Sequence, residues 1–358
     1  MGGAERVTAN LANYWVHKGW SVCVATLTDA ETDFYKLDAD IIRVSLNTAV
    51  ESPTYFLKIR NNLRTLFAVR QLLREYQPDI AIGMMTGASV YLALASRSLP
   101  VHCIGSERTH PPICPPSKDW ELVRTFSYGY LNAVVALTEK SANWLRGNTN
   151  ARFVPVIPNP VVWPLPIQPP IRNPAELMRE DRKICLAVGR LSIEKGFDLL
   201  LAAFSEITHS CPEWDLVIVG KGELYNELQR QIYRMGLQER AYLAGQVGNI
   251  SDWYKAADLF VLSSRFEGFP NVLAEALASG LPAICFDCET GPSDIIRHEI
   301  DGILVPNQDV AALTRNMKKL MTDENMRKKL SSRAVEARQR FSIQKITQMW
   351  EEVFEQIT

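Results

Sequence analysis

The sequence lacks a long apolar run, a regular cysteine framework and a strong excess of charge of either sign. The uncharged, mostly apolar stretch Ile80–Ser96 is too short for a membrane span, and no signal peptide is visible. The seven cysteines are odd in number and irregularly spaced, which fits a reducing compartment. The net charge of -1 argues against a nucleic acid as the partner of the whole molecule.

Two short patterns that could bind a metal are interpreted as structural. Cys285 and Cys288 form a CxxC, but no second pair or histidine cluster accompanies it, so we expect two buried, small apolar residues. Asp38 and Asp40 form a D-x-D just before a short expected strand, and we interpret them as a polar turn. Neither pattern therefore predicts a metal site.

Apolar runs alternate with segments of helical period along the whole chain, and this alternation predicts parallel sheets covered by helices. A length of 358 residues suits two such α/β domains. In the first half, the expected strands are 21–27, 79–82, 101–105 and 133–137. The expected helices there are 4–18, 55–76, 87–97 and 118–130. In the second half, the expected strands are 184–189, 215–220, 259–263 and 282–286. The expected helices there are 196–209, 222–235, 271–279 and 309–322.

A proline-rich segment divides the chain. Eight of the 20 prolines fall between residues 155 and 174, where neither a helix nor an inner strand can form. We therefore expect a first domain, an extended linker, a second domain and a C-terminal helix that packs back on the first domain, over 1–165, 166–182, 183–340 and 341–358. The first 170 residues carry 16 Lys and Arg against 13 Asp and Glu, a weak indication of an anionic partner there.

The sharpest motif is a pair of glutamates eight residues apart, Glu267 and Glu275 (E-x7-E). After Glu267 comes a turn that opens an expected helix, formed by Gly268, Phe269, Pro270 and Asn271. The free N–H groups and positive dipole at the start of that helix favour an anion, and the carboxylates can accept hydrogen bonds from sugar hydroxyls. The alternative is a capped surface helix with two solvated glutamates.

A second motif follows the expected strand 184–189 and runs Gly189-Arg-Leu-Ser-Ile-Glu-Lys-Gly196. Arg190 and Lys195 would project from the strand end and the next helix start, where two cations can neutralise a diphosphate leaving group without a metal. The alternative is a pair of solvated surface cations. Both motifs occupy strand-to-helix turns of one domain, and ligands of doubly wound sheets bind beyond the carboxyl ends of the strands.

Together the two motifs resemble those of glycosyltransferase family 4, and the resemblance extends to 219–222 and 245–254. It implies a GT-B fold of two Rossmann-like α/β domains whose parallel sheets face a central cleft. It also implies a UDP-sugar donor, retention at the anomeric carbon, and no metal or other cofactor. In the front-face mechanism that the family implies, the leaving diphosphate oxygen takes the acceptor's proton. The protein then positions the substrates and stabilises charge.

The resemblance implies a role for each residue of the donor site. Arg190 and Lys195, in the loop that Gly189 opens, are expected to bind the diphosphate. Glu267 is expected to face the donor sugar, and Glu275 to bind the ribose hydroxyls. Backbone groups at 268–271 are expected to hold sugar and phosphate, and the residues expected to frame the base, a uracil, are Gln246 and Val247.

The first half holds the expected acceptor site. Gly2 and Gly3 resemble the family's glycine loop, whose N–H groups approach phosphate and acceptor. The strand that should precede them is missing, so we expect a misplaced start or a truncated chain. Many relatives carry histidine directly after Glu107, where this chain has Arg108, and His110 comes two residues later. Either side chain is expected to support the transferring sugar or the acceptor.

The expected helix 55–76 is rich in cations. Between residues 55 and 74 it has no acid, and it carries Lys58, Arg60, Arg64, Arg70 and Arg74 beside an apolar stripe of Ile59, Leu63, Leu66, Phe67 and Leu73. It resembles the helix of bacterial enzymes that extend polyprenyl-diphosphate-linked glycans, which implies that Lys58, Arg60 and Arg64 bind a lipid-linked acceptor at the membrane. The segments 2–6 and 106–110 similarly resemble exopolysaccharide transferases of the amylovoran type. The alternative is an ordinary surface helix.

The resulting hypothesis is a cytoplasmic enzyme, peripheral on the inner face of the cytoplasmic membrane. It would transfer a hexose or N-acetylhexosamine from a UDP-sugar to a lipid-linked glycan. A nicotinamide-dependent oxidoreductase would need G-x-G-x-x-G, but Tyr225 stands where the third glycine would follow Gly220 and Gly222. A non-catalytic scaffold subunit is the other alternative, and it would not need both motifs.

Overall fold

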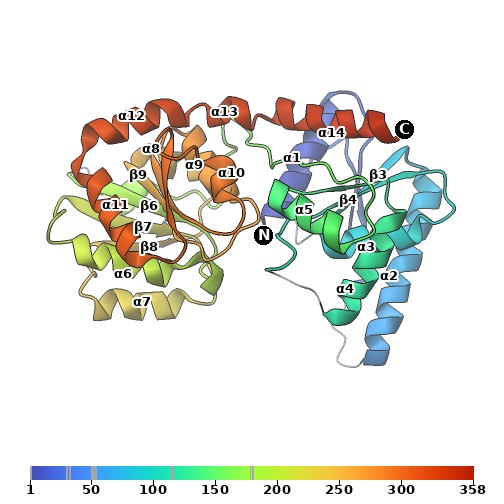
Figure 1. Ribbon diagram of the computed structural model, residues 1–358, viewed down its shortest axis with the longest axis horizontal. Helices are drawn as coiled ribbons and strands as arrows, with labels where there is room; N and C mark the ends of the chain where they lie inside the picture. Colours follow the sequence, from blue (N-terminus) through green and yellow to red (C-terminus); the bar gives the residue numbers. More distant parts are fainter. Residues whose placement is uncertain are drawn as a thin grey trace. The chain divides into compact units, whose positions relative to one another are not determined.

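The computed structural model describes residues 2–29, 31, 34–49, 55–113, 117–177, 179 and 181–358. The chain forms two compact units: unit 1 comprises Met1–Pro160 and Ile343–Thr358, and unit 2 comprises Val161–Ser342. In Figure 1, unit 1 holds the blue to green elements together with the last red helix, so the chain leaves unit 1, builds unit 2 and returns.

Unit 2 is built on one six-stranded sheet in which every neighbouring pair is parallel. Its strands are β6 (Lys183–Val188), β7 (Trp214–Val219), β8 (Ala241–Gly245), β9 (Leu259–Leu262), β10 (Ala283–Asp287) and β11 (Gly302–Pro306). Their order across the sheet is β11-β10-β9-β6-β7-β8. This is the doubly wound order 3-2-1-4-5-6, in which the direction of winding reverses between β6 and β9. A ligand is therefore expected beyond the carboxyl ends of these two strands.

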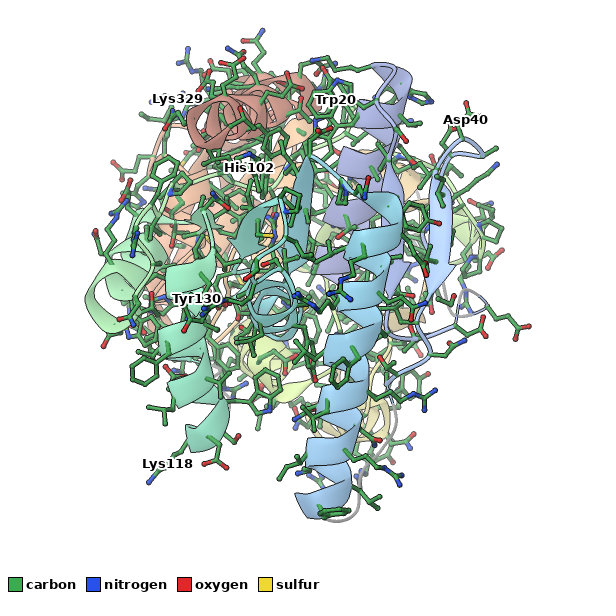
Figure 2. All side chains as sticks on the ribbon, turned by 90° about the vertical axis from the view of Figure 1, so that its right-hand side faces the viewer. Trp20, Asp40, His102, Lys118, Tyr130 and Lys329 are labelled. Carbon is green, nitrogen blue, oxygen red and sulfur yellow. The ribbon has the colours of Figure 1, made fainter. Side chains whose placement is uncertain are left out.

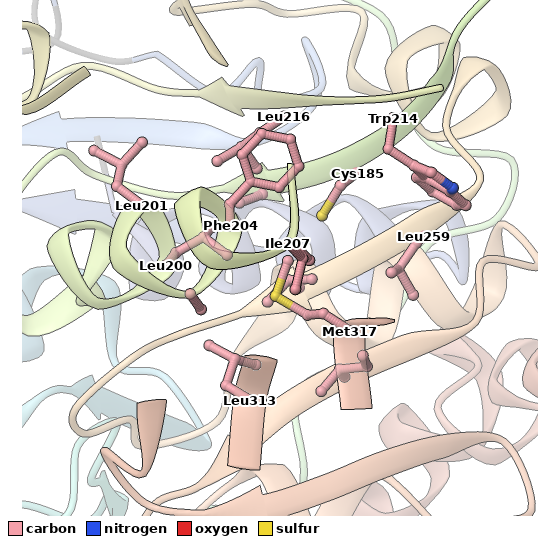
Figure 3. Close-up of a cluster of buried hydrophobic side chains, with 14 of the residues drawn as sticks. Cys185, Leu200, Leu201, Phe204, Ile207, Trp214, Leu216, Leu259, Leu313 and Met317 are labelled. Carbon is pink, nitrogen blue, oxygen red and sulfur yellow. The ribbon is translucent and has the colours of Figure 1, made fainter. Parts of the chain in front are cut away.

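Helices cover both faces of this sheet, so its central strands are mostly apolar rather than alternating. The helices of unit 2 are α6 (Phe197–Ile207), α7 (Tyr225–Arg234), α8 (Ile250–Ala256), α9 (Asn271–Ala278), α10 (Pro292–Ile295), α11 (Val310–Thr322), α12 (Glu324–Ala334) and α13 (Ala337–Arg340). Figure 3 shows one core of buried side chains, to which Phe204 of α6, Met317 of α11, and Trp214 and Leu216 of β7 belong. Each large apolar side chain buried there stabilises the unit by about 1.5–3 kcal/mol.

The cysteines of the CxxC belong to the interior of unit 2. Cys285 of β10 is 0% exposed and Cys288 is 2% exposed, and burial raises the pKa of the Cys288 thiol to about 12. Both thiols therefore stay protonated at neutral pH. The expectation of two buried apolar residues is confirmed.

The proline-rich segment lies along unit 2. The N–H of Gln168 donates to the carbonyl of Gly248 at 3.1 Å, and the N–H of Gly248 donates to the carbonyl of Pro170 at 2.7 Å. A Cβ on Gly248 would lie 1.7 Å from the carbonyl oxygen of Gln168, so only glycine permits this approach. The segment expected as a linker over 166–182 is thus held against the loop after β8.

Unit 1 contains two separate parallel sheets among the described residues. One pairs β1 (Cys23–Thr26) with β2 (Ile42–Ser45), and the other has the order β3-β4-β5, with β3 (Ile80–Met84), β4 (His102–Ser106) and β5 (Ala133–Val135). Its helices are α1 (Gly3–His17), α2 (Tyr55–Tyr76), α3 (Thr86–Ala95), α4 (Lys118–Ser127), α5 (Glu139–Asn148) and α14 (Ile343–Ile357).

The last helix, α14, completes a core of unit 1. Trp350 is fully buried and meets Trp15 of α1 edge to face, with ring centroids 6.4 Å apart. At the surface beside it, Lys18 Nζ lies 2.8 Å from Glu351 Oε2. Residues 333 positions apart in sequence are thereby joined in one unit.

The apolar face of α2 is only partly covered by the rest of unit 1. Leu73 is buried against α3, but Ile59, Leu63 and Phe67 are 43%, 48% and 66% exposed. In Figure 2 the N-terminal half of α2 extends beyond the sheet, and these exposed side chains lie toward that half. The apolar stripe of this helix is therefore divided between a buried C-terminal half and an exposed N-terminal half.

Candidate active site

The two sequence motifs of unit 2 lie in the loops that follow β6 and β9, where the winding of the sheet reverses. The G-R-x4-K-G loop, 189–196, connects β6 to α6, and the turn 263–270 connects β9 to α9. Because β6 and β9 are hydrogen-bonded neighbours, the topology brings together motifs that are about seventy residues apart. This is the position at which doubly wound folds bind nucleotides.

Glycines allow the loops at this edge to contact one another backbone to backbone. A Cβ on Gly220, after β7, would lie 1.8 Å from the carbonyl oxygen of Gly189, and one on Gly222 would lie 2.3 Å from that of Leu191. A Cβ on Gly196 would lie 2.1 Å from the carbonyl oxygen of Ser263. Gly196 also has φ +60, in the left-handed region that favours glycine.

An ion pair joins the two motifs. Lys195 Nζ lies 2.6 Å from Glu267 Oε1, and the two side chains are 20% and 10% exposed. Ser264 Oγ donates to the same carboxylate oxygen at 2.7 Å, and Ser263 Oγ donates to the carbonyl of Lys195 at 2.9 Å. The ammonium group and the carboxylate are therefore positioned by the neighbouring strand end.

A second ion pair between the same loops was not anticipated from the sequence. Arg265 makes a bidentate pair with Asp198 of α6, with Nη1–Oδ1 and Nη2–Oδ2 distances of 2.9 and 2.6 Å. The Arg265 side chain also donates to the carbonyl of Ile193 at 2.7 Å. Its main-chain N–H donates to the carbonyl of Glu194 at 2.8 Å. Burial raises the pKa of Asp198, but the hydrogen bonds from Arg265 outweigh this effect and leave that pKa below its usual value.

The side chain of Arg190 is exposed at the start of the first loop. It is thus in contact with solvent, whereas Lys195 is largely buried in its pair with Glu267. The two cations of the motif therefore differ in environment, one accessible to any anion in solution and the other already balanced by a carboxylate.

The turn after Glu267 is fixed from the next loop of the sheet. Thr290 Oγ1 donates to the carbonyl of Glu267 at 2.5 Å. A Cβ on Gly291, which has φ +96, would lie 2.7 Å from Pro270 Cδ and 3.0 Å from the carbonyl oxygen of Gly268. Phe269 is buried against Phe341, with ring centroids 5.6 Å apart. These contacts hold the backbone that leads into α9.

Helix α9 begins at Asn271, without an acidic residue in its first turn and without a side-chain cap from Pro270. Glu275 lies one turn further and is only 6% exposed. Tyr254 Oη, from α8, donates to Glu275 Oε2 at 3.4 Å. A buried carboxylate so close to a helix N-terminus can accept hydrogen bonds from hydroxyl groups.

Gln246 and Val247 directly follow β8, on the far side of β7 from the two motif loops. Both are half-buried, and the preceding Gly245 has φ +73. Arg172 donates to the carbonyl of Ala244 at 3.0 Å and so supports this loop from the proline-rich segment. The structure places these residues on the same sheet edge as the two motifs.

In unit 1 the segment after β4 is buried and polar. Glu107 is 1% exposed and accepts hydrogen bonds from Tyr128 and, at 2.8 Å, from Thr86. Burial raises the pKa of Glu107, although these hydrogen bonds lower it. Arg124 lies 3.7 Å away and supplies a counter-charge. Sequence reasoning missed this network, because Arg124 on α4 and Tyr128 in the short 3-10 helix that follows meet Glu107 only through the fold, which no local pattern shows.

The other expected acceptor residues are spread over unit 1. Arg108 is 8% exposed, and burial lowers its pKa to about 9. His110 is 3% exposed, with Nδ1 2.9 Å from Ser141 Oγ. The N–H of Gly2 donates to Glu5 Oε2 at 2.6 Å at the start of α1, where Gly3 is exposed. On α2, the side chains of all three cations expected to bind the acceptor are exposed: Lys58, Arg60 and Arg64.

Comparison with known families agrees with this geometry. Residues 1–162 match the family described as Glycosyltransferase Family 4, and residues 171–337 match the family described as Glycosyl transferases group 1. The chain belongs to the GT-B glycosyltransferases. The expected fold of two Rossmann-like domains is therefore confirmed, and the chain is a glycosyltransferase.

Two relatives of this glycosyltransferase carry names from bacterial glycan assembly. The amylovoran biosynthesis glycosyltransferase AmsD of Erwinia amylovora is 28% identical over 98% of this chain and 95% of its own length. An α-1,4-N-acetyl-D-galactosaminyltransferase of Campylobacter jejuni, whose name gives a glycan on PP-undecaprenol, is 28% identical over 98% of this chain and 94% of its own.

Solved structures share the fold of this glycosyltransferase. A sucrose-phosphate synthase from Thermosynechococcus elongatus has a TM-score of 0.84 at 19% identity, over 99% of this chain and 94% of that one. The Anabaena protein HepE, solved in complex with UDP, has a TM-score of 0.79 at 20% identity, over 99% and 96%. At such low identity the likeness concerns the fold alone.

Proposed function

We propose that this glycosyltransferase moves a hexose or N-acetylhexosamine from a UDP-sugar to a lipid-linked glycan, with retention at the anomeric carbon and without a metal. The observation that carries the donor half of this proposal is the pair of Lys195 and Glu267 at the reversal point of the unit 2 sheet. The complex of HepE with UDP and the relative that acts on a PP-undecaprenol glycan support the substrate classes.

The donor diphosphate would bind at the loop 189–196. Lys195 Nζ lies 2.6 Å from the Glu267 carboxylate. A phosphate oxygen can therefore replace this carboxylate as the partner of the ammonium group without a large movement of the lysine side chain. Arg190, exposed at the other end of the loop, would add a second cation from solvent. Two cations and the start of α9 would stabilise the charge that develops on the leaving group, which is the task a metal performs elsewhere.

The sugar and the ribose would lie along the turn into α9. Released from Lys195, the Glu267 carboxylate can accept hydrogen bonds from the hydroxyls of the donor sugar. Glu275 would accept those of the ribose, while Gln246 and Val247 frame the base. Neither glutamate then acts as a nucleophile or a base: the acceptor oxygen bonds to the anomeric carbon on the face from which the diphosphate leaves, and the leaving oxygen takes the acceptor's proton.

The lipid-linked acceptor would reach unit 1 at a membrane surface. None of the helices in the described ranges is long and apolar enough to cross a bilayer. However, α2 and α4 carry strongly exposed apolar side chains, among them Phe56 at 76%, Phe67 at 66%, Leu122 at 60% and Phe126 at 57%. In Figures 1 and 2 the N-terminal ends of both helices extend in the same direction from unit 1. Apolar side chains beside the exposed cations of α2 are the combination that binds anionic bilayers.

The donor half is tested by titrating UDP into the protein in EDTA, with Lys195→Ala as the variant and Lys319→Ala, an exposed lysine of α11, as the matched control. We expect metal-free binding that Lys195→Ala weakens at least tenfold and Lys319→Ala leaves unchanged. Absence of UDP binding by the folded protein would refute the proposed donor. Binding without turnover on any UDP-sugar and polyprenyl-diphosphate glycan would instead indicate a scaffold subunit.

A further inference from the structure

Buried arginines of this protein differ in what balances their charge. The Arg124 side chain, 1% exposed, pairs with Glu121 and lies 3.7 Å from Glu107. Arg327, 7% exposed, donates to two main-chain carbonyls in the last turn of α11, at 2.5 and 2.9 Å. That end of a helix carries the negative pole of its dipole. Each of these guanidinium groups is therefore balanced by its surroundings.

Arg108 has neither kind of counter-charge. Its Nη1 donates to Oδ1 of Asn159 at 2.7 Å, its Nη2 contacts Sδ of Met84 at 3.7 Å, and the guanidinium lies 5.7 Å from the ring centroid of Trp350. All three partners are neutral. In the described part of the chain, no carboxylate oxygen lies within 4.0 Å of the Arg108 guanidinium nitrogens, the distance that defines an ion pair. The buried Nε of Arg108 also has no hydrogen-bond partner there. A buried cation in such surroundings destabilises the free protein.

The position of Arg108 is one at which parallel sheets bind ligands. It is the second residue after β4, at the carboxyl end of the sheet β3-β4-β5. The preceding Glu107 is held by Tyr128 and Thr86, so the backbone that carries Arg108 is fixed. The residue is not sealed from solvent, since 8% of its surface remains accessible.

We propose that Arg108 is an anion-binding residue, whose ligand is a phosphate or carboxylate group of the acceptor. Two oxygens of either group match the planar fork of a guanidinium, and the two Nη atoms of Arg108 carry further N–H groups besides those directed at Asn159 and Met84. The assignment of this anion to the acceptor rests on the proposed function. The existence of an anion site at Arg108 does not, because it follows from the missing counter-charge.

The experiment measures anion binding to the whole protein by calorimetry, with saturating UDP present to fill the donor site. The probes are inorganic pyrophosphate, for a lipid diphosphate, and glucuronate, for an acidic sugar. The variants are Arg108→Gln and Arg108→Met, and the control is Arg97→Gln, which removes an exposed charge of unit 1. We expect at least one probe to bind, with a Kd that rises tenfold or more in both Arg108 variants and less than twofold in the control. The probe that responds identifies the anion.

The melting temperature distinguishes an anion-binding arginine from a merely structural one, because replacing the two should change it in opposite directions. If the charge of Arg108 is unbalanced in the free protein, Arg108→Met should raise its melting temperature, because an apolar side chain fits beside Met84 and Trp350. A lower melting temperature, together with unchanged probe binding, would overturn the proposal, as would a wild type that binds neither probe. Binding that depends on Arg108 in a protein without transferase activity would refute the proposed function and leave the anion site intact.

Discussion

Lys195 and Glu267 form a salt bridge of 2.6 Å between two loops that are 72 residues apart in sequence. The pair places the cation of one motif against the first carboxylate of the other. Each group thereby balances the charge of its partner, and the proposed function requires an anion or a hydroxyl group to take that partner's place.

Removal of Lys195 should therefore harm catalysis more than folding. We expect Lys195→Ala to lower kcat about 100- to 1000-fold, the usual effect of losing one group that stabilises developing charge. The melting temperature should change little, since Ser264 still donates to Glu267. Initial rates with a UDP-sugar, compared with Lys319→Ala, test this. A rate within threefold of wild type would remove Lys195 from the donor site.

Arg190 should act differently, because its side chain is exposed in the free protein. We expect Arg190→Ala to lower kcat and to leave stability unchanged, whereas Arg230→Ala, on α7, should alter neither. Steady-state kinetics at two salt concentrations provide the measurement. Equal effects of the two substitutions would mean that Arg190 is an ordinary surface cation.

The pair of Arg265 and Asp198 should position the donor loops without contacting substrate. Asp198→Asn is expected to raise the KM for the UDP-sugar several-fold, and Arg265→Lys, which loses the bidentate geometry, to do the same. If the pair acts as one unit, the double variant should be no worse than either single one. Additive losses would show that the two residues act separately.

The same pair predicts a dependence of stability on pH. The pKa of Asp198 is lowered in the folded protein, so this carboxylate stabilises the fold at pH values above its unfolded pKa of about 3.9. The contribution is lost as pH falls through the lower, folded value. The melting temperature should therefore fall more steeply between pH 6 and pH 3 for wild type than for Asp198→Asn. Parallel curves would contradict the prediction.

The exposed surface of α2 and α4 should bind anionic bilayers. Arg60→Glu with Arg64→Glu should reduce sedimentation with phosphatidylglycerol vesicles and raise the KM for a lipid-linked acceptor, while hydrolysis of the donor is spared. Phe56→Ser with Phe67→Ser should weaken vesicle binding at high salt as well, because their contribution is apolar. Equal binding of all variants would return α2 to an ordinary surface helix.

Most of the fold could be predicted from period and composition. Every strand and helix expected from the sequence overlaps one in the structure, including the whole of α2. The strands β8 and β11 were not predicted. Glycine and alanine in β8 and the terminal proline of β11 weaken the apolar signal of an inner strand, and neighbouring strands supply their pairing. Short or polar helices such as α5 and α12 escaped for the same reason.

The site could be predicted only as far as its motifs. Spacing suggests that Lys195 and Glu267 lie in turns, but their contact depends on β6 and β9 being neighbours, which the sequence does not show. The period of α2 predicts its apolar stripe, but it cannot tell which half of the stripe is buried, because that depends on where the helix extends past its sheet. The missing counter-charge of Arg108 depends on which residues surround it in space, which no local pattern records.

The glycines at positions 196, 220 and 222 limit how this enzyme can be redesigned. Each lies so close to a neighbouring carbonyl oxygen that a single added methyl group would force the loops apart. A library intended to change donor choice gains nothing from randomising them. Variation belongs instead at side chains that project from this rigid frame, such as Gln246 and Val247. Selection for a new donor nucleotide would therefore explore a small and well-defined set of positions.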